Sequence, residues 1–324
     1  MTASHPLYKP SDEHRRCSID SKSDLPPEPY RTNYRRDYAR LTHTPAFRRL
    51  QGKTQLYPGM EGDFFRNRLT HSLEVAQIAK SIAIRLNETE EFLRDEKMKI
   101  CTDIVEFAGL AHDLGHPPFG HTGEEVLDEL MLECGGFEGK RDDDSLKPQF
   151  GYNDEQLRKI VGLLENFSQT VTPLSYKSAL DIATNGYLRT ELTSKWVDEF
   201  IRGVQIRPNE RYPELTEVLL EDGVREKVEV LKHFVYEKMI HSSRLRIASW
   251  RGKEILREIF TALKQDEGYK LLPEDYRWLH QHFTDRCDRM RVICDFIAGM
   301  TDRYSIEFYG RLTSENPETI FKPL

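Results

Sequence analysis

Residues 69–86 read LTHSLEVAQIAKSIAIRL, in which apolar residues recur every three or four positions along two adjoining stripes. A stripe of that width is typical of a helix that is buried on more than one side. Residues 102–114, TDIVEFAGLAHDL, repeat the pattern. Strand-like alternation is nearly absent, so the sequence predicts an all-α fold. Further helices are expected over 190–203, 223–241, 252–265, 273–285 and 288–311.

The composition is that of a protein with a polar surface and an adequate core. Of the 324 residues, 38% are hydrophobic and 31% are charged, and the formal net charge is −7. An acidic balance argues against a protein that coats nucleic acid over its whole surface. No run approaches the roughly 18 apolar residues of a membrane span, and the N-terminus lacks the apolar core of a signal peptide. We therefore expect no membrane partner.

The five cysteines form no CxxC motif and are odd in number. This pattern favours reduced thiols, and therefore a cytoplasmic protein, over a disulfide framework. We expect each of them to be a small core residue: Cys17, Cys101, Cys134, Cys287 and Cys294.

Residues 112–127, HDLGHPPFGHTGEEVL, concentrate histidines and carboxylates around a Gly-His-Pro-Pro break. Thr122 and Glu125 have the spacing of a capping box, which predicts a helix that begins just after His121. Asn153 has the position of an N-cap for a later helix. A chain bend needed only for packing has little use for so many titratable groups, so we expect a functional site here.

His71, His112 and Asp113 lie on two segments that are too apolar to be surface helices. Buried imidazoles and carboxylates are unfavourable unless they are paired or bound to a metal. Two imidazoles and one carboxylate suit a divalent metal such as Mn²⁺, Fe²⁺, Co²⁺, Ni²⁺ or Zn²⁺. A core histidine that is merely hydrogen-bonded is the alternative, and these three residues alone leave both interpretations open.

Longer motifs weigh in favour of a metal site. They read AFRRLQGKTQLYPG, RNRLTHSLEVAQIA, GLAHDLGHPPFGHTGEEVL, GGFEG and VICDFIAGMTDRYSIEFY. With them the chain, from about residue 34 to 312, resembles the HD-domain superfamily of metal-dependent phosphohydrolases, specifically the deoxyguanosinetriphosphate triphosphohydrolase family. The resemblance implies an all-α HD-domain core with a C-terminal helical extension. We expect an irregular arm over 1–33, the core with its metal site over 34–186, and helices packed on the same domain over 187–324.

The resemblance also implies a reaction, the hydrolysis of a dNTP at its α-phosphorus to a deoxynucleoside and inorganic triphosphate. His71, His112 and Asp113 match metal ligands of the family, and His121 and Glu124 match its catalytic pair. The metal would polarise a phosphate oxygen and help to position the attacking water. The residues agree, because an imidazole and a carboxylate at a helix start can manage a proton beside a bound anion.

Three further positions are expected to contact the substrate. Arg68, one helical turn before the first histidine ligand, matches a phosphate contact, with a structural ion pair as the alternative. Gln51 lies where the family contacts the sugar, and Lys53 is expected to add positive charge for the triphosphate. His116 is interpreted as a supporting residue, and the TDRY motif at 301–304 as fold support or pocket closure.

The fourth metal ligand departs from the family pattern. The family takes this ligand from a motif like ADDIAY, whereas residues 179–185 read ALDIATN. Leu180 then occupies the ligand position, and Asp181, one residue later, is the expected substitute. The sequence therefore predicts three metal ligands from matched motifs. Either Asp181 is the fourth, with a shifted helix register, or the metal site is incomplete.

Two other functions stay open. One is an HD-type 5′-nucleotidase, or phosphomonoesterase, and the other is a relative with a decayed site that only binds nucleotides or single-stranded DNA. The intact catalytic pair argues against the second, and the divergent ALDIATN motif argues for keeping it. We expect Mn²⁺ or Mg²⁺ as the metal. The resemblance also suggests a homo-oligomer, commonly a hexamer in this family, and an allosteric nucleotide or single-stranded DNA as a further partner.

Overall fold

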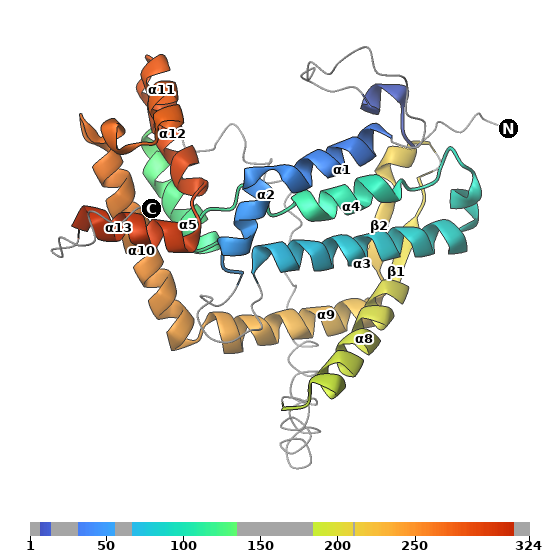
Figure 1. Ribbon diagram of the computed structural model, residues 1–324. Helices are drawn as coiled ribbons and strands as arrows, with labels where there is room; N and C mark the ends of the chain where they lie inside the picture. The colour runs from blue at the N-terminus through green and yellow to red at the C-terminus, as the bar shows by residue number, and fades with distance from the viewer. Residues whose placement is uncertain (1–6, 14–31, 56–66, 135–183, 210, 314–324) are drawn as a thin grey trace. The chain divides into compact units, whose positions relative to one another are not determined.

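The computed structural model describes residues 7–13, 32–55, 67–134, 184–209 and 211–313 (Figure 1). These residues form mainly helices, as the sequence predicts, and none of the described helices is long and apolar enough to cross a membrane. The helices are α1 (Asn33–His43), α2 (Pro45–Arg49), α3 (Arg68–Thr89), α4 (Thr102–Ala111), α5 (His121–Met131), α8 (Gly186–Arg202), α9 (Asp222–Val235), α10 (Ser243–Lys264), α11 (Glu274–His282), α12 (Arg286–Ala298) and α13 (Asp302–Thr313). The strands are β1 (Val204–Arg207) and β2 (Glu217–Leu220), and the short helical turns include η2 (Leu50–Gly52) and η4 (Leu132–Cys134).

The C-terminal helices begin and end at different residues from those predicted. The segment expected as one helix over 288–311 is divided into α12 and α13, because Gly299 caps α12 and the hydroxyl of Thr301 accepts a backbone N–H of the next helix. α10 begins earlier than predicted, at Ser243, because the hydroxyl of Ser242 caps it. Caps of this kind set where a helix begins without changing the spacing of its apolar residues, so that spacing alone does not show the helix boundary.

The chain divides into two compact units, each drawn from three stretches of sequence. The first comprises Met1–Ala39, Glu74–Leu110 and Gln149–Tyr236, and the second comprises Arg40–Leu73, Ala111–Pro148 and Glu237–Leu324. The ranges expected from the sequence are consecutive rather than interleaved, and they stay a prediction. The described residues of the candidate site all belong to the second unit.

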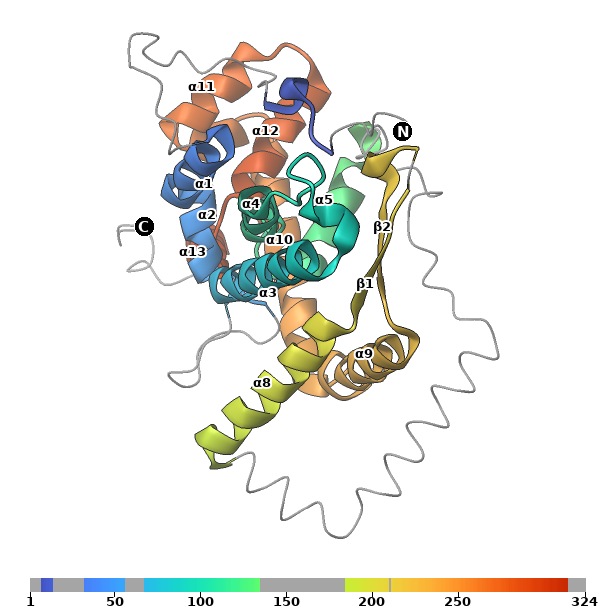
Figure 2. The ribbon, with the colours of Figure 1, turned by 90° about the vertical axis from the view of Figure 1, so that its right-hand side faces the viewer.

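In the first unit, a β-hairpin follows α8, although the sequence shows almost no strand pattern. β1 and β2 pair antiparallel with Val204 opposite Leu220, and Figure 2 shows the two strands running side by side. Val204 also joins Leu86 and Leu93 in a small core. Each strand has only four residues, too few for an alternating pattern to stand out in a helical sequence.

The core of the second unit is built around α10. Its buried side chains lie on one face because they are spaced three or four residues apart, and α10 packs against α5, α12 and α13 (Figure 1). Burying one such side chain stabilises the fold by about 1.5–3 kcal/mol relative to leaving it in water. This packing fixes α5, the helix that begins at the candidate site. The buried residues of α10 include Leu256, Ile259, Phe260 and Leu263, and those of α5 include Val126, Leu127 and Met131.

Three ion pairs join α10 to α5 and to the turn η4 that follows it. The acidic partners recur every four residues, which is the spacing of one helical face. Such solvent-accessible pairs contribute at most about 1 kcal/mol each to the stability of the fold. Their main effect is therefore to help align α5 and η4 with α10. The pairs are Lys253–Glu125 at 2.8 Å, Arg257–Glu129 at 2.6 Å and Lys264–Glu133 at 3.0 Å.

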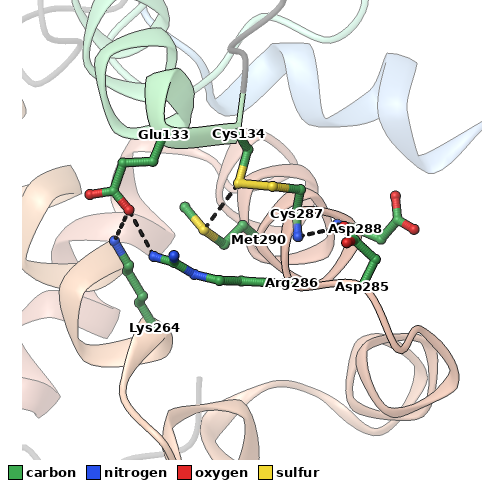
Figure 3. The surroundings of a disulfide bond; sticks show 8 residues. All are labelled: Glu133, Cys134, Lys264, Asp285, Arg286, Cys287, Asp288 and Met290. Carbon is green, nitrogen blue, oxygen red and sulfur yellow. Dashed lines mark hydrogen bonds and ion pairs between the residues drawn. A yellow bond between two sulfur atoms is a disulfide. The ribbon is translucent and has the colours of Figure 1, made fainter.

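Two cysteines contradict the expectation of reduced thiols throughout the chain. Cys134, at the end of η4, and Cys287, in the first turn of α12, form a disulfide with Cα atoms 5.3 Å apart. Figure 3 shows it beside Met290, whose Sδ lies 3.5 Å from Sγ of Cys134. The two cysteines are 153 residues apart in sequence. Their pairing therefore leaves no local motif to recognise.

The other described cysteines are free thiols. Cys101 is half-buried and Cys294 is buried. Burial raises the pKa of Cys294 to about 12, as expected for an inert core thiol. Cys17 lies outside the described residues.

Candidate functional site

The structure brings His71, His112 and Asp113 together. His71 lies at the start of α3, and His112 and Asp113 directly follow the end of α4. One potential ligand atom from each residue lies within 4.8 Å of the others. The two imidazole rings meet edge to face, with centroids 5.3 Å apart. Among the described residues, these side chains therefore converge closely enough to share one metal ion.

Asp113 is the buried member of this group, and its two oxygens have different surroundings. Oδ1 accepts a hydrogen bond from Nη1 of Arg68 at 2.8 Å and lies 3.1 Å from Nε2 of His116. Oδ2 is buried, and no group in the described residues donates a hydrogen bond to it. Nε2 of His112 lies 3.7 Å from this oxygen. Since a buried carboxylate oxygen without a partner is unfavourable, Oδ2 and the two imidazoles fit a divalent cation.

The fourth expected ligand lies outside the described residues. Asp181 and its neighbour Leu180 belong to the segment 135–183, of which no structure is described, and so does the predicted N-cap Asn153. The assignment of Asp181 to the metal therefore stays a prediction.

A turn with unusual backbone angles connects the candidate metal-binding group (His71, His112 and Asp113) to α5. Phe119 and Gly120 both have a φ of 63°, a conformation that costs a non-glycine residue about 1–3 kcal/mol. Gly120 is the N-cap of α5. A Cβ atom on it would lie 2.6 Å from Nη2 of Arg68. The close approach of Arg68 and the positive φ together require glycine at this position.

The capping box predicted for α5 is not formed. The hydroxyl of Thr122 instead shares a hydrogen bond of 2.7 Å with Oγ of Ser249 on α10. Glu125 bonds Lys253. The helix begins at His121 itself, with no side-chain cap. The predicted helix is therefore present and begins within one residue of the expected start. Only the capping box was wrong, because both side chains have partners on α10, which ties the first turn of α5 to that helix.

His121 and Glu124 form a hydrogen-bonded pair in the first turn of α5. Nδ1 of His121 lies 3.1 Å from Oε2 of Glu124, and their side chains are 81% and 58% exposed. The hydrogen bond between them raises the pKa of His121 and lowers the pKa of Glu124. The pair therefore favours an imidazolium beside a carboxylate. Both groups are accessible to a molecule that approaches from solvent.

His116 lies between the candidate metal-binding group and this pair. Its Nε2 is 3.1 Å from Oδ1 of Asp113, and its Nδ1 is 3.8 Å from Oε2 of Glu124. Its ring meets the ring of His121 edge to face, with centroids 5.2 Å apart. Burial lowers the pKa of His116, and the charge of Arg68 acts in the same direction. The sequence predicted only a supporting role, and the spacing of three residues from Asp113 was the signal for this contact.

Arg68 and Gln51 have opposite environments. Arg68 is 2% exposed and donates from Nε to the carbonyl of Thr54 at 3.1 Å, in addition to its bond with Asp113. Its contacts are those of the structural ion pair that the sequence left as the alternative. Gln51, in η2, is exposed.

Lys53 is 4% exposed, and its ammonium group bonds to backbone. Nζ donates to the carbonyls of His116 and Ala298 at 2.6 and 2.8 Å. Burial lowers its pKa to about 8. The lysine thus links the turn after the candidate metal ligands to the end of α12. Phosphate binding by Lys53 stays a prediction, and these two bonds do not favour it.

Known proteins are similar to this chain over the segments that build this site. The family model of the HD domain matches residues 68–161, and the model of the phosphohydrolase-associated domain matches residues 218–311. The chain is 28% identical to deoxyguanosinetriphosphate triphosphohydrolase-like protein 2 of Mesorhizobium japonicum, over 98% of this chain and 100% of the relative. It is also 30% identical to the deoxyguanosinetriphosphate triphosphohydrolase-like protein of Geobacter metallireducens, over 87% of this chain and 89% of the relative. The same identity is found with that of Caldanaerobacter subterraneus, over 95% of this chain and 91% of the relative.

Proposed function

The chain belongs to the family of deoxyguanosinetriphosphate triphosphohydrolase-like proteins, and from this membership we propose that it hydrolyses dNTPs to a deoxynucleoside and inorganic triphosphate. Its HD domain and phosphohydrolase-associated domain are those of a phosphohydrolase. The observation that carries the proposal is the unsatisfied, buried Oδ2 of Asp113 beside two imidazoles. An exposed acid–base pair lies on the other side of His116.

His71, His112 and Asp113 would hold a divalent metal, with Oδ2 of Asp113 as the carboxylate donor. When bound, the metal supplies Lewis-acid polarisation of a phosphate oxygen and a more acidic water. Arg68 holds Oδ1 of the same carboxylate and so orients Oδ2 toward the imidazoles. Mn²⁺ and Mg²⁺ are the metals we favour, and the nitrogen and oxygen donors also accept Fe²⁺, Co²⁺, Ni²⁺ or Zn²⁺.

His121 and Glu124 would manage the proton. One water attacks the α-phosphorus, the bond from phosphorus to the 5′-oxygen breaks, and the 5′-oxygen leaves with one proton. Because Nδ1 of His121 is held by Glu124, Nε2 is the nitrogen that exchanges a proton with the water or with the leaving oxygen. Glu124 fixes the imidazole and stabilises its charged form.

The contacts to phosphate and sugar are proposals of the same kind. The buried guanidinium of Arg68 would attract the triphosphate mainly through its charge. Gln51 is exposed, whereas Lys53 is buried, so the Gln51 side chain is accessible to a sugar hydroxyl. For Lys53, the bonds to two carbonyls support a role in holding the backbone.

Product identity tests the proposed function directly. The purified protein is incubated with Mn²⁺ and each dNTP separately, and products are identified by phosphorus NMR and nucleoside chromatography. Inorganic triphosphate together with a deoxynucleoside is the expected result, and it would also rank the bases.

Two other outcomes would identify the alternatives. Phosphate release from nucleoside monophosphates, without triphosphate from any dNTP, would indicate a 5′-nucleotidase. No turnover and no retained metal would indicate a relative that only binds nucleotides or single-stranded DNA.

Quaternary structure and location extend the proposal. We propose a homo-oligomer, which the family resemblance suggests. The cytoplasmic location was expected from reduced thiols, and it loses that support because Cys134 and Cys287 form a disulfide; it stays a prediction. Light scattering gives the molar mass with and without dNTPs. If the molar mass changes on addition of a dNTP or single-stranded DNA that is not itself hydrolysed, this would support an activating partner.

A further inference from the structure

Asp302, the first residue of α13, bonds to two distant segments of the second unit. Its Oδ2 accepts the N–H of Thr54 at 2.7 Å, and its Oδ1 accepts the N–H of Phe119 at 2.9 Å. These partners are 248 and 183 residues away in sequence. Capping of α13 does not need this carboxylate, because the hydroxyl of Thr301 accepts the N–H of Tyr304. The two oxygens of Asp302 therefore serve the segments around the site.

The bond to Thr54 leads to the metal-binding group. The carbonyl of Thr54 accepts a hydrogen bond from Nε of Arg68, and the N–H of Arg68 donates to the carbonyl of Lys53 at 3.2 Å. Arg68 in turn holds Oδ1 of Asp113. Asp302 thus fixes the segment on which the guanidinium of Arg68 rests.

The bond to Phe119 leads to the acid–base pair. Phe119 has a positive φ that is unfavourable for a side chain with a Cβ atom, so its conformation must be held by other contacts. One is the bond to Asp302, and another is the contact of the ring with Gly252, where a Cβ atom would lie 2.8 Å from the ring. The next residue, Gly120, is the N-cap that sets the direction of His121.

We propose that Asp302 is a positioning residue that fixes the distance between the metal-binding group and the His121–Glu124 pair. The inference deepens the proposed function and rests on it. One carboxylate holds a backbone amide in each half of the site, and Lys53 ties the intervening turn to the end of α12. Loss of the carboxylate would free Phe119 to leave its strained conformation, and His121 would move relative to the metal-binding group.

The test compares Asp302→Ala with Asp285→Ala. Asp285 is a matched control because its carboxylate also accepts two backbone N–H groups at a helix start, those of Cys287 and Asp288, but both lie in its own helix. Hydrogen exchange measured by mass spectrometry follows the backbone of residues 114–125. Equilibrium dialysis measures Mn²⁺ binding, and steady-state kinetics on the dNTP that is turned over gives kcat and KM.

We expect Asp302→Ala to bind Mn²⁺ with wild-type stoichiometry. Exchange over residues 119–124 should accelerate by roughly tenfold, because one hydrogen bond is lost. The kcat should fall by about 10- to 100-fold, with KM little changed, because the substrate still binds but the acid–base pair is misplaced. Asp285→Ala should lose thermal stability without either effect. Asp302→Asn keeps one oxygen acceptor and the same shape, so it should give intermediate values and carries the test if the alanine variant fails to fold.

Several outcomes would overturn the inference. Wild-type exchange over residues 119–124 in Asp302→Ala would do so, as would loss of bound Mn²⁺ or equal losses of kcat in both alanine variants. If the wild-type protein turns over no dNTP, the proposed function fails. Hydrogen exchange and Mn²⁺ binding then still decide whether Asp302 positions the turn.

Discussion

His112 and His121 stand in the same short stretch of sequence, yet they have different partners. His112 lies beside His71 and Oδ2 of Asp113, whereas His121 bonds Glu124 in the first turn of α5. We expect His112→Ala to abolish metal binding and His121→Ala to retain the metal. Turnover should fall about 10²- to 10⁴-fold in His121→Ala, the usual contribution of a positioned acid or base. Metal analysis of dialysed protein and kcat measure the two effects, and full activity in His121→Ala would contradict its assignment.

The His121–Glu124 pair also has a definite pH dependence. Because their hydrogen bond raises the pKa of His121 and lowers that of Glu124, the pair stabilises the fold between the two folded-state values. Its contribution is lost as pH rises through the raised pKa of His121, and also as pH falls through the lowered pKa of Glu124. In Glu124→Gln the pKa of His121 should fall toward its ordinary value. An NMR titration of the imidazole with Mg²⁺ present checks this. An unchanged His121 pKa would mean that the pair does not form in solution.

At the scale of elements, the conformation of the turn before α5 depends on Gly120 more than on Gly115, which also has a positive φ. Gly115 has a φ of 89° with no atom within 4 Å of an added Cβ, whereas on Gly120 that atom would lie 2.6 Å from Nη2 of Arg68. Gly115→Ala should therefore show only the backbone penalty of about 1–2 kcal/mol. Gly120→Ala should cost more and weaken Mn²⁺ binding, because Arg68 must move away from Asp113. Urea unfolding and dialysis measure both effects, and equal results for the two variants would contradict the role given to Arg68.

The disulfide between Cys134 and Cys287 is a second contact between elements, because it joins η4 to α12. It closes a loop of 153 residues, and cross-links of this kind stabilise proteins by about 2–5 kcal/mol. We expect dithiothreitol to lower the unfolding temperature of the oxidised protein and to leave the double variant Cys134→Ser, Cys287→Ser unaffected. Alkylation and peptide mass spectrometry identify the linked cysteines. A link through Cys101 or Cys294 instead would contradict the pairing.

Local patterns account for what the sequence could predict among these elements. The apolar spacing of α3 and α4 lies within a few helical turns, and so does the HDLGHPPFGH motif that supplies His112, Asp113 and His121. The bonds of Asp302 and the cysteine pair join positions far apart along the chain. No local pattern encodes such a partner. The capping box predicted for Thr122 is absent for the same reason, a partner that is distant in sequence. The hydroxyl of Thr122 bonds Ser249 on α10 and not a group within its own helix.

For the whole molecule, the candidate metal centre couples ligand binding to folding. His71, His112 and Asp113 come from two separate stretches of the second unit, so an unfolded chain does not hold them together. A metal that binds only the folded chain stabilises it by about 2.7 kcal/mol when its free concentration is 100 times Kd. We therefore expect Mn²⁺ to raise the unfolding temperature and EDTA to lower it again. The same titration of His112→Ala should give no shift, because the ion would lose an imidazole ligand while Arg68 still holds Asp113. If that variant responded to Mn²⁺ as strongly as the wild type, the stabilising ion would be bound elsewhere in the chain, and Oδ2 of Asp113 would need another partner.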